Sequence, residues 1–220
     1  MREWTESLLL ALGLALLAAY SAARIDQLLG ARAAIRDFYI LSAGEKVASQ
    51  QVKERTDSRT SLVLPTVNSQ RWDKHRIAQY LQSTTMPLGA PVAVLRIPKI
   101  HLEAAVLDGT DSLTLNRAVG RIAGTARPGE QGNIGLAGHR DGFFRGLEDV
   151  VVGDQIELRS LKGTDRYIVD QIRIVMPNQT DVLAPSPIPS LTLVTCYPFH
   201  ILGSAPKRYV VSASLEQRGQ

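Results

Sequence analysis

The stretch "TLVTCYPFHILGSAPKRYVV", residues 192–211, joins two apolar β-type runs through a segment rich in turn-forming residues. It contains the only cysteine of the 220-residue chain, Cys196, and an arginine, Arg208, that opens the second run. A single cysteine cannot close an intrachain disulfide. Cys196 is therefore a structural core residue, a thiol that links a partner, or a nucleophile.

Strand periodicity relates the two residues in space. Side chains alternate between the faces of a strand, so Thr192, Val194 and Cys196 share one face. If the two runs pair antiparallel, Cys196 and Arg208 lie opposite each other at one end of the sheet. A nearby cation favours a thiolate, and a guanidinium can donate hydrogen bonds to a developing oxyanion. For each residue considered alone, the alternative is a role without chemistry: Cys196 as a buried structural cysteine, and Arg208 as an ordinary surface arginine.

Similar short runs with turn residues between them fill the chain from Pro91 onward. They lie at residues 92–97, 102–107, 133–138, 154–160, 166–176, 191–196 and 208–215. Segments 112–120 and 143–150 each favour a turn or two of helix, and residues 124–133 form a Gly-rich loop. Seven or eight short strands predict a mainly β domain, a closed barrel or a sandwich, rather than βαβ units.

The N-terminal region has a different character. Residues 7–23 are an uncharged apolar segment of 17 residues, near the lower limit for spanning a bilayer. We expect a membrane anchor at residues 1–24, with a cleaved signal peptide as the main alternative. A stalk and linker would follow at residues 25–71, and the main domain at residues 72–216. Exported proteins usually pair their cysteines, so a lone exported thiol is shielded or takes part in chemistry.

The charges and histidines exclude some functions. The net charge of +4 comes from scattered Lys and Arg, which makes nucleic-acid binding a weak interpretation. His75, His101 and His200 lack paired metal-ligand spacing, so we expect no metal site. His139, in "NIGLAGHRDGFF", ends an apolar run at a predicted strand–loop junction, where a side chain is both positioned and accessible to solvent. A hydrogen-bonded edge histidine is the alternative.

Together these segments resemble the sortase family, and its class D branch best. The family carries a strand of the "TLVTC" type, an arginine about a dozen residues later, and an upstream histidine like that in "GHRDGFF". "AVLRIPKIHLEAAVLDGTD" is similar to its first two strands, and "LNRAVGRIAGTARPGEQGNIGLAGH" to the approach to its histidine. "RWDKHRIAQYL" resembles the tryptophan-led helix that precedes class D catalytic domains. The resemblance covers residues 92–214.

The resemblance implies a closed eight-stranded β-barrel with short helices, carrying a cysteine transpeptidase. By matching positions, Cys196 would be the nucleophile that cleaves an LPxTG-like sorting signal after its threonine. His139 would be the general acid and base, and Arg208 would stabilise the tetrahedral intermediate or hold the substrate. The partners would be secreted proteins that bear the signal and an amine acceptor, either a cell-wall peptide or a lysine of a surface protein.

The same resemblance implies a location and further contacts. The protein would be single-pass in a bacterial cell membrane, with its catalytic domain extracytoplasmic. Thr195 matches a substrate contact, and residues 176–191 match a loop that covers the signal peptide. The apolar side chains of that loop would form a groove, or only stiffen the loop; they are Val182, Leu183, Pro185, Pro187 and Ile188.

Departures from the family narrow the prediction. No "DP[FWY]" lid motif precedes the predicted barrel, which disfavours the pilin-polymerising class. Asp181 is the only acidic residue in the covering loop, too few oxygen ligands for calcium, so we expect no obligatory metal and no cofactor. Two other functions stay open: a cysteine endopeptidase or hydrolase with water as acceptor, and a non-catalytic surface assembly module.

Overall fold

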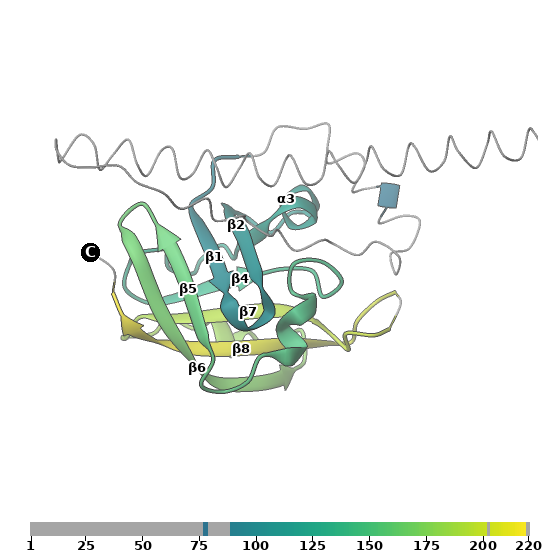
Figure 1. The fold of residues 1–220 in the computed structure, drawn as a ribbon. Helices are drawn as coiled ribbons and strands as arrows, with labels where there is room; N and C mark the ends of the chain where they lie inside the picture. The colour runs from purple at the N-terminus through teal and green to yellow at the C-terminus, as the bar shows by residue number, and fades with distance from the viewer. Residues whose placement is uncertain (1–76, 79–88, 202, 219–220) are drawn as a thin grey trace, which may run out of the picture.

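The computed structural model describes residues 77–78, 89–201 and 203–218. In this part of the chain the strands form a closed barrel in the order β1-β2-β3-β4-β7-β8-β6-β5 (Figure 1). The strands are β1 (Ala93–Ile97), β2 (Leu102–Asp108), β3 (Val119–Arg121), β4 (Asn133–Ala137), β5 (Gln155–Ser160), β6 (Gly163–Val175), β7 (Ser190–Tyr197) and β8 (Lys207–Gln217). The predicted mainly β fold and closed eight-stranded barrel are confirmed.

Four short helices connect the strands within the described residues. They are η2 (Pro98–Ile100), α3 (Ser112–Arg117), η3 (Arg145–Asp149) and η4 (Thr180–Leu183). Asp111 caps α3, because its Oδ1 accepts a hydrogen bond from the Thr114 backbone N–H at 3.0 Å. The helical turns predicted within residues 112–120 and 143–150 are confirmed as α3 and η3.

Strand β3 was not predicted. Sequence analysis expected a turn or two of helix within residues 112–120, whereas the helix ends at Arg117 and Val119–Arg121 forms a strand. This strand pairs parallel with β2, and a Cβ added to Gly120 would lie 2.2 Å from the Gly109 carbonyl oxygen. A three-residue strand with a central glycine has no alternating pattern, so only its neighbours in space define it.

The barrel interior is filled by alternate residues of its strands. Ile134 and Leu136 of β4 and Leu191 and Leu193 of β7 are all 0% exposed. Burial of such side chains stabilises a fold by about 1.5–3 kcal/mol each. Because β4 and β7 pair parallel, these four residues lie side by side, and the intervening positions of both strands face outward.

The predicted anchor and stalk lie outside the described residues, and the predicted domain limits stay predictions. Of the tryptophan-led helix expected at residues 71–81, only Ile77 and Ala78 are described, and both are helical. Among the described residues, no helix is both long enough and apolar enough to cross a membrane.

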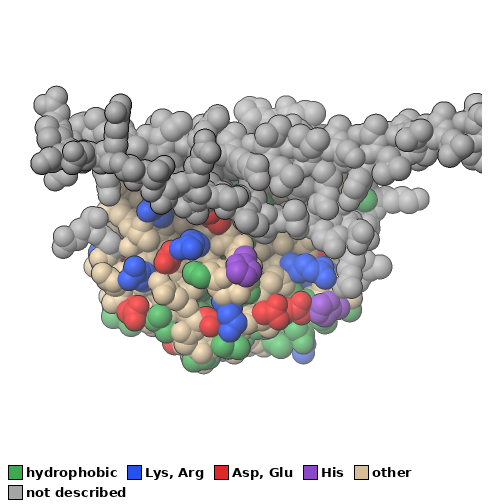
Figure 2. All heavy atoms as spheres, viewed as in Figure 1, with side chains coloured by type: hydrophobic (Ala, Val, Ile, Leu, Met, Phe, Trp, Pro, Cys, Tyr) green, Lys and Arg blue, Asp and Glu red, His purple; other side chains and the backbone are tan. Residues whose placement is uncertain are grey.

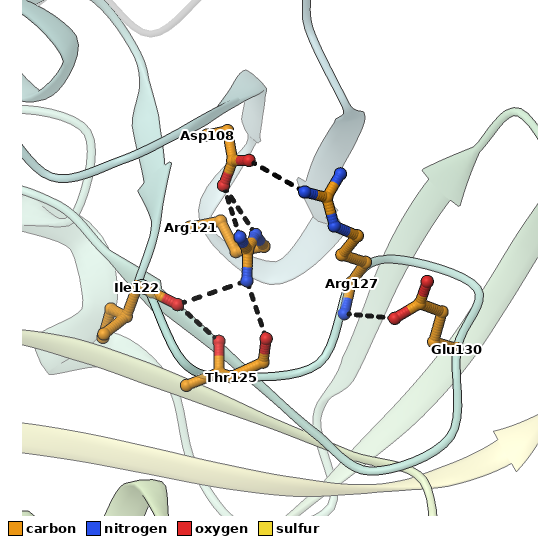
Figure 3. A network of polar contacts seen from close by, with 6 residues as sticks. All are labelled: Asp108, Arg121, Ile122, Thr125, Arg127 and Glu130. Atoms are coloured by element: carbon orange, nitrogen blue, oxygen red, sulfur yellow. Dashed lines mark hydrogen bonds and ion pairs between the residues drawn. The ribbon is translucent and has the colours of Figure 1, made fainter.

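A buried arginine anchors the loop between β3 and β4 (Figure 3). The Arg121 side chain pairs with Asp108 at 2.6 Å and donates to the Thr125 carbonyl oxygen at 2.6 Å. Arg127 lies on the other side of Asp108, with 3.6 Å between Nη2 and Oδ2. Residues 122–127 are thereby held against the ends of β2 and β3. On the face that Figure 2 shows, basic and acidic side chains are interspersed, without a continuous basic area there.

Candidate active site

Strand β7 places the cysteine on the outside of the barrel. Leu191, Leu193 and Thr195 are buried toward the interior, whereas Cys196 is a partly exposed free thiol. By strand alternation, Cys196 shares the outer face with Thr192 and Val194, as the sequence predicts. The thiol is therefore accessible at the end of a strand whose inner face is fixed by the core.

Arg208 lies directly across the sheet from this thiol. Strands β7 and β8 pair antiparallel with Cys196 opposite Arg208, which is the condition on which the expected juxtaposition of the two residues depends. Arg208 Nη1 donates to the backbone carbonyl oxygens of Ala205 at 3.2 Å and Lys207 at 3.0 Å. The guanidinium is thus held by the backbone at the start of its own strand and just before it, beside the cysteine.

The histidine reaches the same end of the barrel through β4. The last registered pair of the parallel strands β4 and β7 is Ala137 with Val194, two residues before His139 and two before Cys196. The Gly138 N–H donates to the Val194 carbonyl oxygen at 3.2 Å, so the chain stays beside β7 beyond the strand. His139, Cys196 and Arg208 therefore come from three neighbouring strands and lie at one end of the sheet.

A tight turn holds the His139 backbone. Its carbonyl oxygen accepts hydrogen bonds from the N–H groups of Gly142 at 3.0 Å and Phe144 at 3.1 Å. The Phe144 ring is 0% exposed, and it lies so close to Gly138 that an added Cβ there would be 2.8 Å away. The position of His139 thus depends on a glycine that leaves room for a buried ring.

Thr195 was predicted to contact substrate. Its side chain is 2% exposed, and its hydroxyl donates to the Gly138 carbonyl oxygen at 2.7 Å. A substrate contact through this hydroxyl would require that hydrogen bond to break. In the structure, Thr195 joins the cysteine strand to the residue before His139, and the substrate contact stays a prediction.

The predicted apolar residues of the loop between β6 and β7 fall into two groups. Val182 is buried with Val175 and Val210 in a small cluster on the outer face of the barrel, and Leu183 packs against this cluster. The other three are exposed, Ile188 at 60%; they are Pro185, Pro187 and Ile188. Val182 and Leu183 shape the surface beside the cysteine strand, while the roles predicted for all five in binding stay predictions.

Two polar residues that sequence analysis missed fasten this loop to the barrel. Asn133 Nδ2 donates to the carbonyl oxygens of Val182 at 3.1 Å and Ala184 at 3.3 Å. The Thr192 hydroxyl donates to Asn133 Oδ1 at 2.8 Å, and both side chains are buried. The only sign of this role in the sequence was an asparagine at the start of an apolar strand, and Thr192, with which it pairs, lies 59 positions away.

Aromatic side chains support this end of the barrel from within. The rings of Phe199 and Tyr209 pack edge to face with centroids 5.0 Å apart, and Tyr197 stacks on Tyr209 at 6.2 Å. Burial, followed by the negative charge of Glu148 and by Tyr197, raises the pKa of the Tyr209 phenol. Tyr209 is therefore neutral at physiological pH, and it packs against the core on the face of β8 opposite Arg208.

In the described part of the chain, His, Cys, Asp and Glu form no group of three or more that could hold a metal ion. Asp181, the acidic residue of the loop, is exposed and pairs with Arg173 at 3.7 Å. The expected independence from metal stays a prediction, because only a measurement of activity tests it.

Comparison with known proteins adds independent information. Residues 95–216 match the family model described as the sortase domain. The chain is 37% identical over 124 residues to sortase D of Bacillus subtilis (strain 168), and the match covers 56% of this chain and 63% of that protein. The chain thus spans less than two thirds of the length of that curated relative.

Solved structures are similar as well. A sortase D5 transpeptidase of Clostridium perfringens is 28% identical with a TM-score of 0.54, over 64% of this chain and 89% of that one. A sortase from Actinomyces oris is also 28% identical with a TM-score of 0.54, over 59% of this chain and 82% of its own. The family-model match includes the whole of the cysteine strand β7, and it includes the barrel except for the first two residues of β1 and the last residue of the arginine strand β8.

Proposed function

The chain belongs to the sortase family of cysteine transpeptidases, and we propose that Cys196, His139 and Arg208 are its catalytic residues. The observation that carries this proposal is the β7–β8 register, which sets the free thiol of Cys196 opposite the Arg208 guanidinium. The parallel pairing of β4 with β7 supports it, because it leads His139 to the same end.

In the first half-reaction, the Cys196 thiolate attacks the carbonyl carbon of the scissile peptide bond. The carbonyl oxygen becomes an oxyanion, to which Arg208 donates hydrogen bonds after leaving the carbonyls of Ala205 and Lys207. The carbon–nitrogen bond then breaks, and protonated His139 gives its proton to the departing amine. The products are a thioester on Cys196 and the released C-terminal peptide.

In the second half-reaction, an amine replaces the thiol. Neutral His139 takes a proton from the incoming amine as its nitrogen attacks the thioester carbon. The carbon–sulfur bond breaks, a new amide forms, and Cys196 leaves as the thiolate that began the cycle. Water in place of the amine would give a carboxylic acid and hence the hydrolase activity considered above.

The substrate that we propose is an LPxTG-like signal in a secreted protein, cleaved after threonine. Leu183 and Val194 are partly exposed and pack on the buried outer-face cluster of three valines, and they offer an apolar surface beside the cysteine to the leucine and proline of such a signal. The acceptor would be a cell-wall peptide amine or a lysine of a surface protein. The apolar residues 7–23 support an enzyme held at the outer side of a bacterial membrane.

The test is single-turnover acylation with LPxTG-like peptides, followed by intact-protein mass. Cys196→Ala should give no adduct, since the chain has no other thiol. Arg208→Ala should acylate about 10²- to 10³-fold more slowly, and Arg208→Lys should recover little because an ammonium lacks the planar fork. His139→Ala should slow both half-reactions. An adduct on Cys196→Ala, or full activity without Arg208, would refute this assignment of roles.

Added amines distinguish the three functions. Oligoglycine or a diamine should yield a ligated peptide from a transpeptidase, only acid from an endopeptidase, and neither from a binding module. Membrane attachment has a separate test: the full chain should stay with membranes after alkaline wash. A mature form beginning near Arg24 would instead indicate a signal peptide.

A further inference from the structure

Arg140 follows the candidate catalytic histidine directly, and its side chain is nearly buried, at 8% exposed. Its guanidinium donates to two backbone carbonyl oxygens of the loop between β7 and β8, Pro198 through Nη1 and Gly203 through Nη2, each at 2.6 Å. One planar side chain therefore joins the His139 turn to the loop whose two ends carry Cys196 and Arg208.

We propose that Arg140 is a positioning residue that holds His139, Cys196 and Arg208 in one reactive geometry. This inference rests on the proposed function, in which those three residues carry the reaction. Arg140 acts through its two loop carbonyls and is not assigned any contact with the substrate.

The chemistry of the contact favours arginine specifically. The two acceptors are five residues apart in the loop and bind separate nitrogens of one guanidinium. The rigid fork of arginine serves both at once, whereas a lysine ammonium is a point charge on a flexible stem. Hydrogen bonds from a cation are shorter and stronger than neutral ones, consistent with the 2.6 Å distances.

The loop between β7 and β8 needs the hydrogen bonds from Arg140, because the proposed reaction breaks a hydrogen bond between this loop and Arg208. Arg208 Nη1 donates to the Ala205 carbonyl oxygen at 3.2 Å. When Arg208 turns toward the substrate carbonyl, that bond is lost, and the hydrogen bonds from Arg140 keep the loop in place. The loop has another contact, in which His200 Nε2 lies 2.7 Å from Oε2 of Glu148 in η3. Both side chains are exposed, so water screens this interaction and weakens it as an anchor.

The chain offers a matched control. Arg121 is also 8% exposed and also donates to backbone carbonyls of a loop, at Thr125 and Ile122. Its loop, between β3 and β4, does not carry the three candidate catalytic residues. Arg121→Met and Arg140→Met both remove a buried guanidinium that anchors a loop. They differ in which loop is released, and Arg121→Met also breaks the ion pair with Asp108, which makes it the more disruptive change.

The first measurement is hydrogen exchange of the wild-type chain and the two variants. Arg140→Met should speed exchange in residues 198–206 and 139–144 by about tenfold or more, the effect of losing one hydrogen bond to a charged group. Arg121→Met should speed exchange in residues 122–132 and leave residues 198–206 unchanged. Unchanged exchange in residues 198–206 of Arg140→Met would overturn the proposal.

The second measurement is acylation at saturating peptide. Arg140→Met should lower the maximal rate by about 10²-fold, the usual cost of misplacing reacting groups by about 1 Å, with little change in KM. Arg140→Lys should recover only a small part of this lost rate.

If Arg140→Met unfolds, the comparison is made with Arg140→Lys, which should still lower the maximal rate by about tenfold or more while KM is retained. Equal rate losses in Arg121→Met and the Arg140 variant at equal stability would refute positioning. If the wild-type chain is inactive but the two variants still change hydrogen exchange as expected, the proposed function is overturned and the anchoring of the loop by Arg140 is not.

Discussion

Gly138→Ala tests whether a buried ring beneath the His139 turn fixes that residue. An alanine Cβ at this position would lie 2.8 Å from two atoms of the Phe144 ring, where ordinary contact begins at 3.4 Å. The ring is 0% exposed and belongs to the main core, so a shift of the ring must disturb its neighbours in the core. Gly138 has no positive φ, and alanine meets no backbone strain there.

The expected cost is that of overpacking a core, about 1–3 kcal/mol of unfolding free energy. Relief of the clash must shift the ring or the 138–139 backbone, since Gly138 also accepts the Thr195 hydroxyl and donates to Val194. A displacement of His139 approaching 1 Å should slow acylation by about 10²-fold. The assays are denaturant unfolding and single-turnover acylation.

Gly89→Ala is the matched control, because an added Cβ there has nothing within 4 Å. Combining Gly138→Ala with Phe144→Leu should recover part of both losses, since the smaller side chain vacates the ring space. We expect a coupling of about 0.5–3 kcal/mol between the two changes. A stable and fully active Gly138→Ala protein, or strict additivity in the double variant, would refute this reasoning.

Three further outcomes are expected. Thr192→Val leaves the buried Asn133 Oδ1 without its 2.8 Å donor. Unfolding free energy should therefore fall by about 1–3 kcal/mol, and amide exchange should quicken at residues 180–184. Unaltered exchange there would contradict this. Asp111→Ala should cost about 1 kcal/mol through loss of the α3 cap. Hydrogen bonds from Thr114 lower the pKa of Asp111, so its contribution is present above the unfolded pKa of about 4 and fades as pH falls through the lower folded value. Denaturant unfolding across that pH range should show that the difference in unfolding free energy between wild type and Asp111→Ala becomes smaller as pH falls. A chelator should leave acylation unchanged, and several-fold stimulation by calcium would show that ligands come from residues outside the loop.

Local patterns in the sequence determined most of the strands and one feature of the site. Alternation and turn residues predict where a strand lies without reference to the rest of the chain, as for β7 and β8. Their short connection predicts the antiparallel pairing that sets Cys196 opposite Arg208. The likeness to a family added the closed eight-stranded barrel and the roles proposed for the three candidate residues.

Tertiary structure decided the features that depend on distant neighbours. Strand β3 exists because β2 and β4 pair with it, and its three residues have no pattern of their own. Arg140 and Asn133 look like ordinary polar residues in the sequence, yet each hydrogen-bonds carbonyls about 50–60 positions away. Backbone carbonyls are the same at every residue, so composition and periodicity carry no record of which one a side chain will reach. Only the closed barrel brings those acceptors within hydrogen-bonding distance.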